Sequence, residues 1–217
     1  LLHPDGAEAH PDPHVWMDPA LWATGIEVVR DALAEADASG AAVFTANAAA
    51  YRARLDALDA YARRALATVP QNARVLVTAH DAFGYFGRSY GFEVRGIQGI
   101  STESEAGVRD IERLVEMLVS RRIPAVFVES TVSERGVRAL VAGASARGHE
   151  VRVGGQLYSD AMGREGTWEG TYVGMIEHNV KTIVEALGGV VPEGGIRASP
   201  APVPFGVTEN GGRKGSQ

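Results

Sequence analysis

Apolar residues recur at helical spacing along the first third of the chain. A polar leading loop over 1–13 comes first, and Asp18-Pro19 then supplies a helix cap and a first-turn proline. The apolar stripe that follows predicts one helix, which ends near Gly40. A second, longer stripe predicts a single helix over 41–69, and a proline ends it. At 1.5 Å per residue such a helix would span roughly 40 Å, a length typical of a helix that bridges two lobes.

From residue 74 onward, short apolar runs alternate with helical stripes. The runs are rich in β-branched residues and predict four strands, over 75–78, 92–97, 125–128 and 150–153. Strands that alternate with helices are typical of a parallel sheet built from β-α-β units. We therefore predict an α/β fold, with a parallel-sheet C-terminal lobe over 70–189 that carries helices on both faces, and a flexible tail over 190–217.

The composition is that of an ordinary globular protein. Of the 217 residues, 45% are hydrophobic and 22% are charged, which argues against wholesale disorder. The net charge of −6 argues against a general nucleic-acid binder and is compatible with a cation ligand. The absence of cysteine excludes disulfides, thiolate metal sites and cysteine nucleophiles. No apolar run of about 18 residues, the length that predicts a membrane span, occurs in the sequence.

Six histidines are the first candidates for chemistry. Four of them are expected to be solvated surface or loop residues without a defined role: His3, His10, His149 and His178. His14 differs, because prolines flank its segment and a tryptophan follows it, which predicts a fixed backbone just before a helix. On spacing alone, a metal ligand and a helix-capping residue remain equally good interpretations of His14.

Three ionisable residues follow predicted strands. His80, Glu129 and Asp160 all fall at the carboxyl ends of such strands, which is the edge where open α/β sheets bind ligands. Helix capping is the alternative for Asp160. Taken jointly, the three residues favour a site, and imidazole together with carboxylate suits Zn²⁺ or Mn²⁺.

Common enzyme motifs are absent. The chain contains no G-x-S-x-G, H-E-x-x-H or G-x-x-x-x-G-K-[ST] motif, and no G-x-G-x-x-G that would indicate a dinucleotide site. Gly96-x-x-Gly99 and Gly154-Gly155 are predicted to form turns instead. A metal-dependent hydrolase remains the alternative function, in which an open metal position binds water and Glu129 acts as the general base.

Three segments resemble the metal motifs of one transport family. Asp12–Pro19, Val77–Phe86 and Leu157–Gly163 are similar, in this order, to the second, third and fourth metal motifs of the zinc- and manganese-binding solute-binding proteins of ABC transporters. The resemblance runs from about Pro11 to Gly189. It implies that His14, His80 and Asp160 are the metal ligands. By the same resemblance, Glu129 is a supporting carboxylate and not a ligand.

The resemblance also implies a function outside enzymology. A protein of this family is an extracytoplasmic receptor, either periplasmic or lipid-anchored on the outer face of the cell membrane. It carries Zn²⁺ or Mn²⁺ as cargo and delivers the ion to a membrane ABC permease. We accordingly expect a monomer that is not an enzyme and has no nucleic-acid partner. A nitrogen-rich site favours zinc, but the sequence leaves the choice between Zn²⁺ and Mn²⁺ open.

One departure from the family pattern affects the domain prediction. The family has another ligand histidine in a motif well upstream, and this chain contains no such motif. We therefore expect an N-terminally truncated chain. Residues 1–40 would be a remnant of an N-terminal lobe, with a His-containing loop and one helix, and 41–69 would be the bridging helix.

Overall fold

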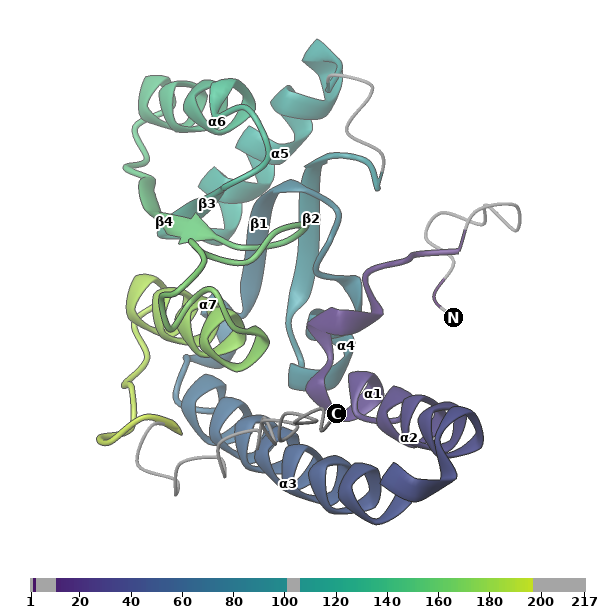
Figure 1. The fold of residues 1–217 in the computed structure, drawn as a ribbon. Helices are drawn as coiled ribbons and strands as arrows, with labels where there is room; N and C mark the ends of the chain where they lie inside the picture. The colour runs from purple at the N-terminus through teal and green to yellow at the C-terminus, as the bar shows by residue number, and fades with distance from the viewer. Residues whose placement is uncertain (1, 3–10, 101–105, 197–217) are drawn as a thin grey trace, which may run out of the picture.

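A long helix lies along one side of the structure and packs against the parallel-strand lobe (Figure 1). The structure is a computed structural model that describes residue 2 and residues 11–100 and 106–196. The long helix, α3 (Ala41–Leu66), is continuous over 26 residues and ends three residues before the predicted boundary, where the backbone tightens into i→i−3 hydrogen bonds. Its buried residues begin only at Leu55, so the second half of the helix packs on the lobe.

The region before α3 contains two helices where one was predicted. After the short 3-10 turn η2 (Val15–Met17), the chain forms α1 (Pro19–Trp22) and α2 (Gly25–Ala36). Asp18 caps α1 as expected, since its Oδ1 accepts hydrogen bonds of 3.0 Å from two backbone N–H groups. The break comes at Thr24, whose hydroxyl donates to the carbonyl oxygen of Leu21 and competes with helix continuation. A second 3-10 turn, η3 (Ala38–Gly40), joins α2 to α3.

All four predicted strands are present, and all pair in parallel. Strand β1 (Val75–His80) pairs with β2 (Glu93–Gln98), and β3 (Ala125–Glu129) pairs with β4 (Arg152–Leu157). Strands β1 and β3 contact each other, but the hydrogen-bonded ladders form two two-stranded sheets, not the single sheet that was predicted. The parallel α/β class is confirmed.

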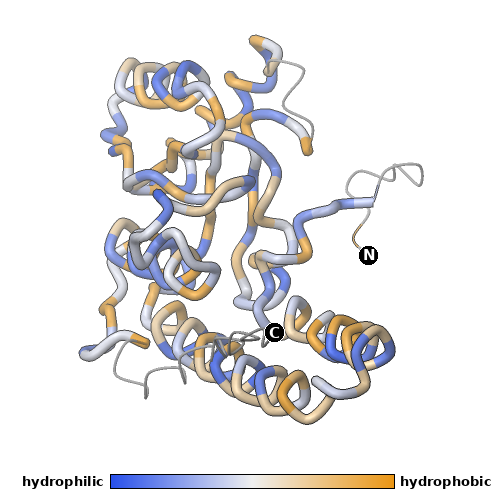
Figure 2. Tube along the Cα trace, in the orientation of Figure 1, coloured by the Kyte–Doolittle hydropathy of each residue, from blue (hydrophilic) through white to orange (hydrophobic). Residues whose placement is uncertain are grey.

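Helices cover both faces of the strands, as predicted (Figures 1 and 2). On one face Val75, Val77 and Ala79 share a core with α5 (Val108–Arg121) and α6 (Arg135–Ala146). On the other face Leu76 and Phe127 share a core with α3, with α4 (Gly84–Tyr90) and with α7 (Tyr172–Ala186). Alternate β1 residues point to opposite faces, so His80 lies on the same face as Leu76.

The glycines that were predicted to form turns lie inside strands or next to them. Gly154 and Gly155 are part of β4, and Gly96 is part of β2. A Cβ at Gly154 would lie 2.7 Å from the Cβ of Ala186 on α7 and 2.8 Å from the Phe127 ring. The turn prediction was wrong: at Gly154 and Gly155 the missing side chains let α7 approach β4 closely, and at Gly96 the missing side chain leaves room for the backbone of Asp81.

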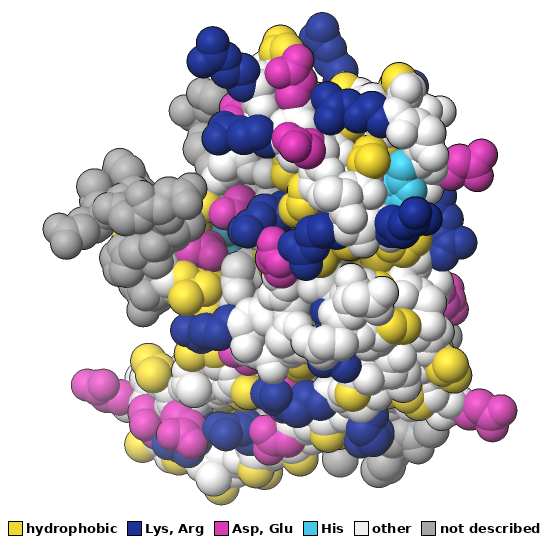
Figure 3. Space-filling model, turned by 180° about the vertical axis from the view of Figure 1, so that it is seen from behind, with side chains coloured by type: hydrophobic (Ala, Val, Ile, Leu, Met, Phe, Trp, Pro, Cys, Tyr) yellow, Lys and Arg dark blue, Asp and Glu magenta, His cyan; other side chains and the backbone are white. Residues whose placement is uncertain are grey.

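Two further observations concern the surface and the end of the described chain. The face seen in Figure 3 carries Lys and Arg side chains interspersed with Asp and Glu, which fits the mixed composition. Within the predicted tail, Ile196 is buried and its N–H donates to Glu177; residues 197–217 lie outside the described part. No helix of the described residues is long and apolar enough to cross a membrane.

Candidate metal centre

The segment before η2 fixes His14 through an aspartate two residues earlier. One oxygen of Asp12 accepts the backbone N–H of His14 at 2.9 Å and lies 2.7 Å from Nδ1 of its ring. Tyr85 holds this segment from α4, because its hydroxyl donates to the carbonyl oxygen of Asp12. His14 is 3% exposed, so its ring is buried and has one orientation set by Asp12.

His80 is the last residue of β1 and is completely buried. A single carboxylate, that of Glu129 at the end of β3, holds it at two points. Oε1 of Glu129 accepts the backbone N–H of His80 at 2.8 Å, and Oε2 lies 2.7 Å from Nδ1 of the ring. This arrangement directs Nε2 of His80 away from Glu129.

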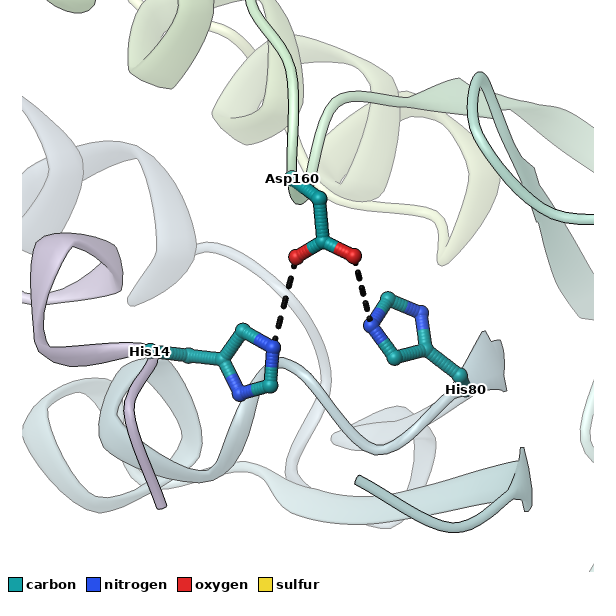
Figure 4. Close-up of side chains that lie close together, drawn as sticks. All are labelled: His14, His80 and Asp160. Atoms are coloured by element: carbon teal, nitrogen blue, oxygen red, sulfur yellow. Dashed lines mark ion pairs between the residues drawn. The ribbon is translucent and has the colours of Figure 1, made fainter. Parts of the chain in front are cut away.

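Asp160 completes the cluster from the loop that follows β4 (Figure 4). Its Oδ1 lies 3.3 Å from Nε2 of His14, and its Oδ2 lies 3.3 Å from Nε2 of His80. One ligand atom from each of the three residues lies within 4.8 Å of the others. The structure thus brings together the three residues that the sequence analysis put forward as ligands, and Asp160, at 39% side-chain exposure, forms the side of the cluster open to solvent.

The electrostatics of the cluster suit a cation. Each imidazole has a carboxylate at Nδ1, so we assign the proton of the neutral ring to Nδ1, which leaves the Nε2 lone pair to face Asp160. Three acceptors then converge on one point. Among the described residues neither ring nitrogen of His80 makes a hydrogen bond of good geometry, although Nδ1 lies 2.7 Å from Oε2 of Glu129. Burial of the ring lowers the pKa of His80, but the carboxylates of Glu129 and Asp160 outweigh it, and the net pKa is raised. A cation held by two imidazoles and a carboxylate satisfies this donor set.

Glu129 lies behind His80 and outside the cluster of ligand atoms. It is 2% exposed, and both of its oxygens are taken up by His80. The role implied by the family resemblance, a supporting carboxylate, agrees with this geometry. The equivalent support for His14, Asp12, was missed in the sequence analysis although it belongs to a quoted motif; its position two residues before His14 was the available signal.

The other histidines lie apart from the cluster. Nε2 of His149 lies 2.9 Å from the carbonyl oxygen of Ile123, and Nε2 of His178 lies 2.9 Å from that of Gln156. Neither is grouped with other potential metal ligands among the described residues. His3 and His10 lie outside the described residues. The capping alternative for Asp160 does not hold, because Thr171 caps the helix that follows, α7.

The parallel-strand lobe and the long helix α3 are features that this chain shares with a class of solute-binding proteins. The chain belongs to the family described as "ZnuA: Zinc-uptake complex component A periplasmic", whose sequence model matches residues 2–186. The solved structure of the periplasmic zinc binding protein TroA from Treponema pallidum matches with a TM-score of 0.80 at 51% identity, over 83% of this chain and 65% of that chain.

Two similar proteins are named for different metals. The manganese-binding lipoprotein MntA of Bacillus subtilis is 50% identical over 186 residues, which is 86% of this chain and 61% of MntA. The zinc-binding protein TroA of Treponema pallidum is 51% identical over 180 residues, which is 83% of this chain and 58% of TroA. The chain therefore spans less than two thirds of the length of each of these relatives.

Proposed function

We propose that this chain is the metal-binding part of an extracytoplasmic receptor that delivers Zn²⁺ or Mn²⁺ to an ABC uptake permease. The observation that carries the proposal is the convergence of Nε2 of His14, Nε2 of His80 and the carboxylate of Asp160 on one point. Carboxylates at both Nδ1 atoms add support, because metal-ligating histidines commonly donate their second N–H to such a group.

Both metals remain within the proposal. Two imidazoles and one carboxylate form a donor set that binds zinc more tightly than manganese by the Irving–Williams order. The two relatives named above bind manganese and zinc by name and are almost equally similar to this chain, at 50% and 51% identity. The ion actually carried then depends on which metal is available to the receptor.

The ion is cargo in this proposal, and no reaction is performed on it. The family is one of uptake-complex components, and nothing in the comparisons supports the hydrolase alternative. That alternative needs Glu129 as a general base facing a metal-bound water. Both oxygens of Glu129 instead contact His80 on the side away from Asp160.

Location and organisation are proposed on the same grounds. The family description is periplasmic, and MntA is named a lipoprotein, so we place the whole protein outside the cytoplasm, either free in the periplasm or lipid-anchored. We propose that 70–189 is the C-terminal lobe, that 41–69 is the bridging helix and that 1–40 belongs to a second lobe. The first half of α3 and all of α2 contain no buried residue, which suits a surface that a second lobe covers.

Zinc and manganese titrations of the chain test the proposal. Isothermal titration calorimetry should give one site per chain, and His80→Ala should nearly abolish binding because one of two imidazoles is lost. The matched control is His149→Ala, which removes an imidazole outside the cluster and should leave the Kd unchanged. Tight binding that survives His80→Ala would refute the assignment of the site. Turnover of generic phosphate or ester substrates with either metal, lost in Glu129→Gln, would favour the hydrolase instead.

A further inference from the structure

The three clustered residues are not supported in the same way. Each histidine is held by a buried carboxylate, Asp12 for His14 and Glu129 for His80. Among the described residues the Asp160 carboxylate receives no hydrogen bond, and its ion pairs are those with the two Nε2 atoms. The place of its oxygens is therefore set by the backbone of the loop that carries it.

Asn179 on α7 binds the backbone of that loop two residues before Asp160. Its Oδ1 accepts the N–H of Tyr158 at 2.9 Å, and its Nδ2 donates to the carbonyl oxygen of the same residue at 2.7 Å. The side chain is 1% exposed, and both ends of its amide are used on one residue. Asn179 thus binds Tyr158 in the way that the backbone of a neighbouring strand would. As a result, the residue that follows the end of β4 at Leu157 is also held by two hydrogen bonds.

A second side chain holds the residue between Tyr158 and Asp160. The indole N–H of Trp16 donates to the carbonyl oxygen of Ser159 at 2.9 Å. The Trp16 ring also lies edge-on to His14, with ring centroids 5.3 Å apart, so a change at Trp16 disturbs a second member of the cluster. Within the described part of the chain, Asn179 makes no hydrogen bond with His14, His80 or Asp160, so it is the cleaner residue to test.

We propose that Asn179 is a positioning residue of the metal site: its amide fixes the backbone of Tyr158 and thereby places the Asp160 carboxylate opposite the two histidine Nε2 atoms. This inference rests on the proposed function, because it assigns a role in metal affinity. Supporting residues around metal ligands typically contribute about 10–100-fold in affinity, and Asn179 belongs with them although it touches no ligand side chain.

A double-mutant cycle on the 217-residue chain tests the proposal, with Zn²⁺ as the probe and calorimetry as the readout. Asn179→Leu keeps the number and branching of the side-chain heavy atoms and removes both hydrogen bonds, and it should weaken zinc binding about ten-fold or more. In the Asp160→Ala background the same substitution should leave the Kd unchanged, because Asn179 acts only through Asp160. A merely structural role would instead weaken binding to the same extent in both backgrounds.

Two further variants sharpen the test. Asn179→Asp keeps the acceptor for the Tyr158 N–H but replaces the donor by an oxygen that repels the Tyr158 carbonyl oxygen, so it should also weaken zinc binding; it decides alone if Asn179→Leu does not fold. Ile183→Ala, a buried change one turn further along α7, should lower the urea midpoint and leave the zinc Kd unchanged.

Failure of the inference differs from failure of the proposed function. Zinc binding that is the same in wild type and His80→Ala would refute the site as a whole, and the role of Asn179 with it. Zinc binding that depends on His80 but is unchanged in folded Asn179→Leu and Asn179→Asp would overturn this inference alone. A loss that persists undiminished in the Asp160→Ala background would overturn it as well.

Discussion

Glu129 holds His80 at two points, with 2.8 Å from the backbone N–H of His80 to one carboxylate oxygen and 2.7 Å from ring Nδ1 to the other. A histidine at the end of a strand can rotate about its side-chain bonds, and this double contact removes that freedom. The pair therefore determines both the direction of Nε2 and the ease with which the ring gains a proton.

Glu129→Gln should weaken zinc binding about 10–100-fold while the chain stays folded. Gln keeps an acceptor and the shape of the side chain but loses the negative charge that raises the pKa of His80. With that charge removed and the burial retained, the pKa of His80 should fall. Calorimetry measures the affinity, and an NMR titration of the histidine ring protons measures the pKa. A variant with unchanged zinc affinity and an unchanged His80 pKa would contradict the supporting role.

Zinc affinity should decrease as the pH falls. A ligating imidazole must be neutral, so protons compete with the ion and binding releases them. The pKa of His80 is raised above its ordinary value near 6.5, so the competition should begin at a higher pH than for an ordinary histidine. At low pH, where protons compete at both imidazoles, the binding of one zinc ion should release more than one proton, and the logarithm of the affinity should change with pH accordingly. Calorimetric titrations at several pH values, corrected for zinc binding by the buffer, measure this dependence. An affinity that stays the same from about pH 7.5 to 5.5 would exclude imidazole ligands.

The metal-free chain should show a pH dependence of the opposite sign. Since the folded-state pKa of His80 is raised, its protonation stabilises the fold; this contribution is fully present below about pH 6.5 and is lost as the pH rises through the folded-state pKa. The comparison is with His80→Gln, which cannot titrate. Urea unfolding in the presence of a chelator should show the wild type losing stability relative to the variant between about pH 6 and 8. A difference that stays constant over this range would contradict the raised pKa.

Gly154→Ala should destabilise the fold by about 1–3 kcal/mol, because the new methyl group would press on the Phe127 ring and on Ala186 of α7. The matched control is Gly25→Ala at the start of α2, where a Cβ would meet nothing within 4 Å and where alanine should stabilise the helix by about 0.5–1 kcal/mol. Urea denaturation of both variants measures the two effects. An unchanged midpoint for Gly154→Ala would show that α7 can move away from β4 without cost.

The sequence predicted those parts of the structure that depend on local pattern. β-branched runs located all four strands, although β4 (Arg152–Leu157) begins two residues and ends four residues later than predicted, and strand ends then led to His80 and Asp160. His14 was left open between ligand and cap until the resemblance was considered, because a residue before a helix suits both roles. The glycines of β4 were misassigned because the pattern does not reveal that α7 packs directly on them.

Residues that act through distant parts of the chain were beyond that reasoning. Asn179 reaches the backbone of Tyr158 from 21 residues away, and a buried amide on a helix gives no sign of its partner. Asp12 is a different case: it lies only two residues before His14, and this local signal was missed. The division of the strands into two pairs arises because β1 and β3 lie in contact without forming a hydrogen-bonded ladder, a relationship that no local pattern records.

The segment that carries Trp16 and the loop that carries Ser159 are joined by a hydrogen bond between residues 143 positions apart. An ion held by the adjacent His14 and Asp160 would act there as a removable cross-link that closes most of the chain into a ring. An ion that binds only the folded chain raises the free energy of unfolding in proportion to the logarithm of its concentration, once that concentration exceeds the Kd. Metal binding would therefore oppose the separation of these two segments and make the loaded chain harder to unfold than the empty one.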